Sequence, residues 1–154
     1  METVGANIVH LVRGTEGMSG SDFDALRTAR PGLQVMVTIP VRGREALYLA
    51  ESVAETADFL LLDSAHPETG NVGATGHTHD WEISREIVEE VGRPVFLAGG
   101  LGPENVAEAI RTVHPAGVDS ETRTSRRVTA AVARTWARVR AFVDTAKATS
   151  GRKA

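Results

Sequence analysis

Strand-like and helix-like segments alternate strictly along this chain, and that alternation is the feature that most limits how it can fold. Five apolar or β-branched runs are each followed by a segment with apolar residues at helical spacing. The expected strands are Asn7–Val12, Leu33–Val41, Phe59–Leu62, Pro94–Ala98 and Ala116–Asp119. Repeated β-then-α units of roughly thirty residues predict a parallel sheet covered by helices, so the expected fold class is α/β.

Helices are expected after each of these strands. Apolar residues recur at helical spacing from Phe23 to Ala29, directly after capping residues at 19–22, and Pro31-Gly32 ends that pattern. Further helices are predicted over Arg44–Thr56, over Ser84–Val91, after Pro103 and over Val128–Ala146.

Composition excludes several kinds of protein. The 154 residues, 42% hydrophobic and 24% charged, suit one globular domain, which we expect over 1–148 with a frayed tail at 149–154. The absence of cysteine excludes disulfides, thiolate metal sites and a thiol nucleophile, and a cytoplasmic setting is the default. No segment approaches the ~20 apolar residues of a membrane span. The net charge of −3 argues against nucleic acid as a partner.

Two architectures fit five β-then-α units. An open doubly wound sheet can be built from five strands, whereas a closed (β/α)8 barrel has eight and typically about 200 residues or more. Counting alone therefore favours the open sheet. A dinucleotide-binding fingerprint would support it, but Gly73–Gly76 lies far beyond its strand and lacks the required glycine spacing.

Five motifs in the second half of the chain occur in a definite order and at definite spacings. They are L-D-S at 62–64, G-A-T-G-H-T-H-D-W at 73–81, P-V-F-L-A-G-G-L at 94–101, P-E-N-V-A-E-A-I at 103–110 and G-V-D at 117–119. In these motifs the chain closely resembles phosphoribosylanthranilate isomerase of tryptophan biosynthesis, a family of (β/α)8 barrels. The resemblance implies an incomplete, TIM-barrel-like fold whose parallel strands correspond to barrel strands 4 to 8, with helices outside.

The resemblance also implies a reaction. The family carries out an Amadori rearrangement of N-(5-phosphoribosyl)anthranilate to the carboxyphenylamino-deoxyribulose phosphate. In it, a general acid opens the ribose ring and a general base removes a proton from C2. Asp63 matches the family's acid, and a carboxyl group partly desolvated in a barrel mouth can hold its proton near neutral pH.

Further site residues follow from the same resemblance, which implies neither a cofactor nor a metal. The phosphate-binding residues are Gly99, Gly100 and Ser120, and the loop over the substrate contains Gly73, Thr75, Gly76 and Asp80. Some of these residues could have a purely structural role. Asp63-Ser64 can be a helix N-cap or a hydrogen-bonded strand end, and Gly99-Gly100 can allow tight packing between a strand and a helix. The histidines at 10, 66, 77 and 79 have no carboxylate or thiolate at ligand spacing, and Trp81 is expected to be a packing anchor.

Two departures from the family pattern limit the expected activity. The family's general base is a cysteine on the first strand, and this chain has no cysteine. After Asp119 the chain is two residues shorter than the family, and Glu121 stands where a turn glycine is usual, so its carboxylate is expected to repel phosphate. Two classes remain: an isomerase, and a catalytically silent phosphate-ligand-binding or interaction protein of the same fold.

An incomplete barrel also has consequences for partners. Sheet edges at Asn7–Val12 and Ala116–Asp119 would carry unpaired backbone groups, and the barrel interior would be uncovered. We therefore expect self-association, or a partner chain that supplies the missing strands, besides a phosphorylated small-molecule substrate. The side chains expected to face the interior include Val35, Val37, Leu60 and Val95.

Overall fold

The computed structural model describes residues 5–12, 18–65, 78–128 and 131–151, with the backbone alone at 126–128 and 131–134. Five strands form one sheet in the order β1-β2-β3-β4-β5, and each pairing is parallel. Their bounds are β1 Ile8–Leu11, β2 Gln34–Val41, β3 Phe59–Ser64, β4 Val95–Leu97 and β5 Gly117–Val118. Strand order thus follows chain order, as the alternation predicted.

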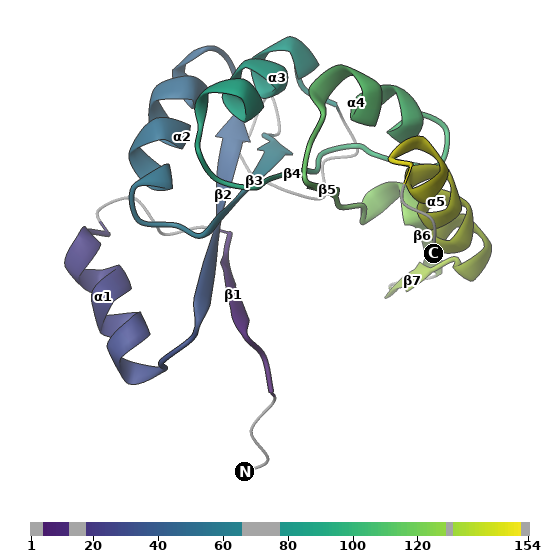
Figure 1. Ribbon diagram of the computed structural model, residues 1–154. Helices are drawn as coiled ribbons and strands as arrows, with labels where there is room; N and C mark the ends of the chain where they lie inside the picture. Colours follow the sequence, from purple (N-terminus) through teal and green to yellow (C-terminus); the bar gives the residue numbers. More distant parts are fainter. Residues whose placement is uncertain (1–4, 13–17, 66–77, 129–130, 152–154) are drawn as a thin grey trace.

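Helices cover one side of this sheet. They are α1 Gly20–Ala29, α2 Glu45–Ala54, α3 Trp81–Glu90, α4 Val106–Val113 and α5 Trp136–Thr149. Figure 1 shows the strands as the inner layer of an arch and the helices along its outer, convex side. This is the layering of a (β/α)8 barrel, of which the five strands form a sector, so the expected fold class is confirmed. None of the described helices is both long and apolar enough to cross a membrane.

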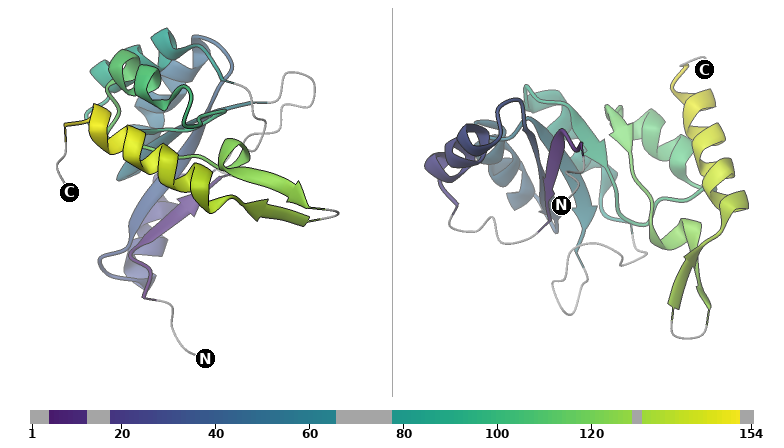
Figure 2. Two further views of the ribbon diagram at one scale, coloured as in Figure 1. Left: turned by 90° about the vertical axis from the view of Figure 1, so that its right-hand side faces the viewer. Right: turned by 90° about the horizontal axis from the view of Figure 1, so that it is seen from below.

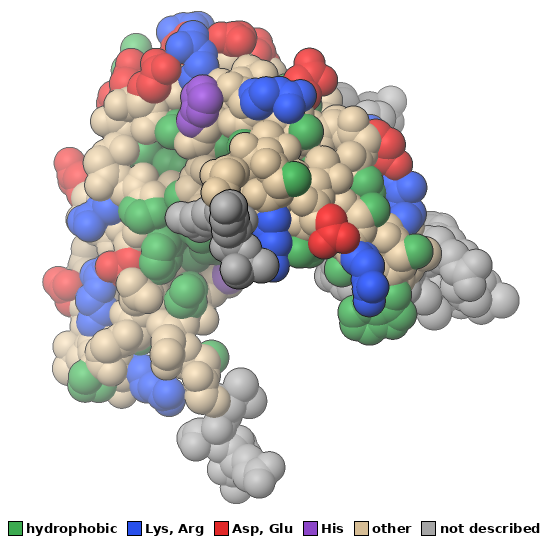
Figure 3. All heavy atoms as spheres, turned by 45° about the vertical axis from the view of Figure 1, so that its right-hand side comes forward, with side chains coloured by type: hydrophobic (Ala, Val, Ile, Leu, Met, Phe, Trp, Pro, Cys, Tyr) green, Lys and Arg blue, Asp and Glu red, His purple; other side chains and the backbone are tan. Residues whose placement is uncertain are grey.

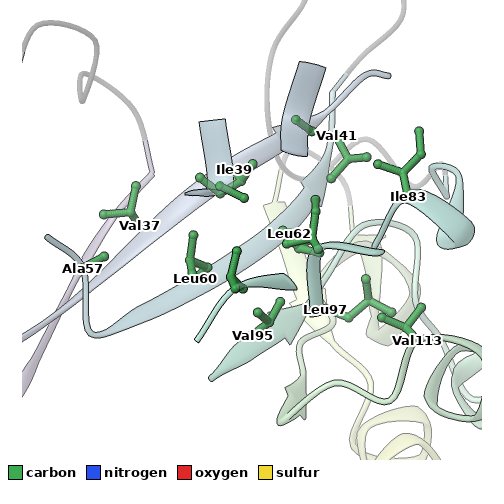
Figure 4. Packing of buried hydrophobic residues seen from close by; sticks show 14 of the residues in the cluster. Val37, Ile39, Val41, Ala57, Leu60, Leu62, Ile83, Val95, Leu97 and Val113 are labelled. Carbon is green, nitrogen blue, oxygen red and sulfur yellow. The ribbon is translucent and has the colours of Figure 1, made fainter. Parts of the chain in front are cut away.

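The main core lies between the sheet and the helices. Leu60 and Leu62 of β3 and Leu97 of β4 are fully buried in it. Figure 4 shows these side chains on the helix side of the sheet, with Ile83 of α3 and Val113 of α4 close by. Because successive strand residues point to opposite faces, the neighbouring positions point inward, to the concave face.

One expectation about the strand faces is wrong. Val35, Val37, Leu60 and Val95 were expected to face the barrel interior, yet each is at most 2% exposed and belongs to the core under the helices. Both faces of a barrel strand are apolar, so the sequence pattern does not tell one face from the other. In the paired strands β2 and β3, the residues that alternate with these core residues point to the concave face.

A second difference concerns the C-terminal region. One helix was predicted over Val128–Ala146, but Ser125–Val128 (β6) and Ala131–Arg134 (β7) form an antiparallel hairpin, and α5 begins only at Trp136. Thr135 has an extended backbone, and its N–H donates to the carbonyl oxygen of Thr124 at 2.9 Å, which separates strand from helix. Figure 2 shows the hairpin projecting from the body of the molecule. Valine and threonine favour strands, which explains how spacing alone misled the prediction.

The far end of the chain differs slightly from the expected tail. Thr149 is the last residue of α5, and the N–H of Ser150 donates to the carbonyl oxygen of Ala146 at 3.0 Å. The helix therefore continues one residue into the segment that was expected to be frayed. Residues 152–154 lie outside the described part of the chain.

Candidate active site

A cavity of about 250 Å³ lies on the concave face, at the carboxyl ends of the strands. Figure 3 shows the hollow that the arched molecule leaves between its two limbs. The lining contains four residues that the sequence predicted, Asp63, Gly99, Gly100 and Ser120, together with His10, Thr38, Asp119 and Glu121, among others. Parallel strands bring their carboxyl ends to one rim, and this explains how residues from β3, β4 and β5 meet.

Asp63, near the end of β3, is the buried carboxylic acid of this cavity. It is 9% exposed, and its Oδ1 accepts a hydrogen bond of 2.7 Å from the N–H of Ser64. Burial raises the pKa of Asp63 to about 6, and the negative charges of Asp119 and Glu121 act in the same direction, while the Ser64 N–H opposes them. A carboxyl group with this pKa retains a protonated fraction near neutral pH and can donate a proton.

Gly99 and Gly100, which follow β4, form a turn that an L residue adopts only with strain. Their φ angles are 82° and 60°. A Cβ atom on Gly99 would lie 2.2 Å from Oγ of Ser64 and 2.8 Å from its backbone nitrogen. Gly99 therefore has a packing role, because its backbone lies against Ser64 with no room for a side chain. The backbone of Gly99 and Gly100 also lies at the cavity surface, where its N–H groups can approach an anion.

Two polar side chains hold this turn in place. Asn105 donates from Nδ2 to the carbonyl oxygen of Gly100 at 3.1 Å, and its Oδ1 accepts from the N–H of Gly102 at 2.8 Å. The Ser120 hydroxyl donates to the carbonyl oxygen of Leu101 at 2.6 Å. Ser120 thus links the loop after β5 to the loop after β4 and fixes the two sides of the proposed anion site.

His79 is a structural residue of this region that sequence reasoning missed. Its Nδ1 lies 3.0 Å from the Ser64 hydroxyl, and its Nε2 lies 2.7 Å from the hydroxyl of Ser84, which is fully buried. Burial lowers the pKa of His79 to about 4, although Asp80 opposes this shift, so the ring is neutral at pH 7. The ring joins the end of β3 to the first turns of α3. Ser64 is 2% exposed, its side chain lies against the backbone of Gly99, and it is not among the residues that line the cavity.

The residues predicted in the substrate loop are only partly visible. Gly73, Thr75 and Gly76 lie outside the described residues. Asp80 caps α3: its Oδ1 accepts from the N–H of Glu82 at 2.9 Å, so the helix starts at Trp81 rather than at Ser84. Asp80 is not among the residues that line the cavity.

For Trp81 the sequence predicted the role that the structure shows, and for His10 it did not. Trp81 packs against the core cluster, which confirms its expected role as an anchor. His10, to which the sequence assigned no role, lines the cavity from β1, and its Nε2 lies 2.8 Å from Oγ1 of Thr38. Within the described ranges, no group of three or more histidine, cysteine or acidic residues could hold a metal ion.

Comparison with known proteins adds to this geometry. The family model of N-(5'phosphoribosyl)anthranilate (PRA) isomerase matches residues 18–122. N-(5'-phosphoribosyl)anthranilate isomerase 2 of Methanosarcina mazei is 45% identical over 96 residues, which are 62% of this chain and 42% of that protein. The chain spans less than half the length of the curated relatives it matches.

Solved structures show the same arrangement of elements. The N-(5'-phosphoribosyl)anthranilate isomerase of Pyrococcus furiosus matches with a TM-score of 0.69 at 26% identity, over 94% of this chain and 64% of that one. A phosphoribosyl anthranilate isomerase in complex with reduced 1-(o-carboxyphenylamino)-1-deoxyribulose 5-phosphate matches with a TM-score of 0.62 at 23% identity, over 92% and 60%. At that identity the second match shows the fold alone.

Proposed function

Since the chain belongs to the N-(5'-phosphoribosyl)anthranilate isomerase family, we propose that it serves the isomerisation of N-(5-phosphoribosyl)anthranilate in tryptophan biosynthesis. The observation that carries this proposal is Asp63: a buried carboxyl group with a pKa of about 6, at the carboxyl end of a central strand and inside a cavity. A biosynthetic role of this kind fits a cytoplasmic setting.

Asp63 acts as the general acid in this proposal. The reaction needs a proton on the ribose ring oxygen, so that the ring opens to a Schiff base, and then the removal of a proton from C2. Asp63 supplies the first proton. The phosphate of the substrate lies against the backbone N–H groups of Gly99 and Gly100, on the side of the cavity that Ser120 closes.

The general base is the open part of the mechanism, because the chain contains no cysteine. Within the cavity, His10 is placed to take a proton from a substrate held near Asp63, since both side chains line the same space. The other source is a partner that contributes its own base. If the base comes from a partner, we expect the chain alone to turn over slowly, because loss of a general base typically removes ~10²–10⁴-fold in rate.

Two exposed apolar surfaces support a partner. Among the described residues β1 pairs only with β2, and Ile8 on that edge strand is 44% exposed. At the other limb of the arch, Trp136 and Val143 of α5 are 81% and 40% exposed. In a closed barrel both surfaces are covered, because another strand pairs with β1 and another helix packs beside α5. We propose that further βα units, from a second copy or another chain, occupy them.

A steady-state assay tests the function. The purified chain is assayed alone and mixed with a fragment that carries three βα units of a family member, each with wild-type Asp63 and with Asp63→Asn. We expect slow turnover alone, faster turnover in the mixture, and loss of both with Asp63→Asn. Asp24→Asn, an exposed carboxylate on α1, is the matched control. Turnover that survives Asp63→Asn would refute the assignment of the acid.

The second candidate is a binding protein of the same fold without catalysis. The absence of cysteine favours it, because the residue type of the family's general base is missing. It predicts saturable binding of a phosphorylated analogue of the product, measured by calorimetry, with no turnover even in the presence of the partner fragment.

A further inference from the structure

Glu121 brings a carboxylate to the wall of the cavity that also contains the backbone of Gly99 and Gly100. We propose that Glu121 is a specificity determinant of this site: it weakens the binding of a doubly charged phosphate beside Gly99 and Gly100 relative to that of an anionic group with a single charge. The inference rests on the proposed function, because it concerns the phosphorylated end of the ligand.

The position of Glu121 is fixed by its neighbours. The Thr124 hydroxyl donates to the carbonyl oxygens of Ser120 and Glu121, at 3.2 and 3.1 Å. The Ser120 hydroxyl in turn donates to the carbonyl oxygen of Leu101, just beyond the glycine turn. The backbone of Glu121 therefore keeps its place relative to Gly100, and only side-chain rotation can move its charge.

Among the described residues that line the cavity, no lysine or arginine offsets this carboxylate. The titratable side chains among these residues are His10, Asp63, Asp119 and Glu121. Arg123 follows closely in the chain and is not among these lining residues. The negative charge of Glu121 thus repels a phosphate dianion at the glycine turn about twice as strongly as a monoanion at the same place.

The same carboxylate acts on the proposed acid. Its negative charge is one of the causes that raise the pKa of Asp63, after burial and together with Asp119. Glu121 therefore has two opposite effects, since it weakens the hold on phosphate and helps Asp63 to keep its proton. A neutral residue at position 121 should therefore strengthen the binding of phosphate and lower the pKa of Asp63.

A pair of matched ligands isolates the effect on phosphate. Phenyl phosphate carries nearly two charges at pH 8, because the second pKa of a phosphate monoester is about 6, whereas phenyl sulfate carries one. Both are titrated by calorimetry into the full-length wild-type chain, Glu121→Gln and the control Glu51→Gln, an exposed carboxylate on α2. Because both ligands are titrated into the same variant at the same pH, the free protein is the same in each comparison of the two ligands.

We expect the wild-type chain to bind the sulfate at least as tightly as the phosphate. Glu121→Gln should shift the ratio of the two dissociation constants about fivefold toward the phosphate, as expected for one partly screened charge. Glu51→Gln should leave the ratio unchanged. An unchanged ratio in Glu121→Gln, or an equal shift in Glu51→Gln, would overturn the proposal alone. Failure of both esters to bind any variant would overturn it together with the phosphate part of the proposed function.

The effect on the acid has its own readout. The side-chain carboxyl carbon of Asp63 is followed by ¹³C NMR as a function of pH in the wild-type chain, Glu121→Gln and Glu51→Gln. The pKa of Asp63 should fall in Glu121→Gln and stay in place in Glu51→Gln. A purely structural role for Glu121 would not move this titration, so an unmoved Asp63 pKa contradicts the proposed coupling.

Discussion

The hydroxyl group of Ser64 lies 3.0 Å from Nδ1 of His79. Through this contact the residue that follows Asp63 is tied to the segment that leads into α3, because the other ring nitrogen of His79 bonds Ser84 on that helix. A neutral ring makes both contacts by donating one hydrogen bond and accepting the other, since each serine hydroxyl can donate or accept. The residue next to the proposed acid is therefore held to α3 through one buried histidine.

The first prediction follows from the lowered pKa of His79, about 4 against an ordinary 6.5. Between these values the unfolded chain binds the proton more tightly, so the stability that His79 contributes is complete above pH 6.5 and is lost as the pH falls toward 4. The difference in unfolding free energy between the wild-type chain and His79→Gln should fall by about 2 kcal/mol from pH 7 to pH 4.5. Urea denaturation at the two pH values measures it, with His114→Asn, an exposed site, as the control.

The second prediction concerns Asp63, whose folded pKa is raised from 3.8 to about 6. Here the folded chain binds the proton more tightly, so the stability is present below pH 4 and is lost as the pH rises through 6. Asp63→Asn should therefore be more stable than the wild-type chain at pH 8, by about 2 kcal/mol, and nearly equal to it at pH 4. Thermal unfolding at both pH values checks this. A destabilised variant at pH 8 would mean that burial of this carboxylate carries no cost.

The third prediction tests the close approach of Gly99 to Ser64. Gly99→Ala places a methyl group against Ser64 and forces alanine to a φ of 82°, so we expect a loss of about 3 kcal/mol. Ser64→Gly in the same chain should restore part of it, because Oγ and Cβ of Ser64 are two of the three contacts. Gly92→Ala, with nothing near its added methyl group, is the matched control and should cost little.

The fourth prediction concerns association. If Trp136 lies in a contact between chains, Trp136→Ser should shift the chain toward monomer in sedimentation velocity at low micromolar concentration. Tyr48→Ser removes an aromatic side chain of similar exposure, 77%, from α2, and should leave the sedimentation coefficient unchanged. An equal change in both variants would indicate nonspecific association through exposed aromatic side chains rather than a defined contact at Trp136.

The sequence predicted those parts of the site that depend on topology. Asp63, Gly99 and Ser120 each lie at the carboxyl end of a strand, and parallel strands must end at one rim, so their meeting needed no knowledge of side-chain packing. His79 was missed because its partners, Ser64 and Ser84, are ordinary serines, and only the folded chain shows that one ring lies between them. The hairpin at Ser125–Arg134 was missed because its valines also fit a helical spacing.

The order of the strands has a consequence for how the molecule is made. Each strand pairs with the one synthesised just before it, so no pairing has to wait for a distant part of the chain. Pairing between successive strands closes smaller loops than pairing between distant strands, which lowers the entropic cost of each step. The sheet is therefore expected to grow one unit at a time from β1 toward β5 as the polypeptide leaves the ribosome. Stalled nascent chains of increasing length should acquire protease resistance in steps, with the β2–β3 pairing protected before β5 emerges.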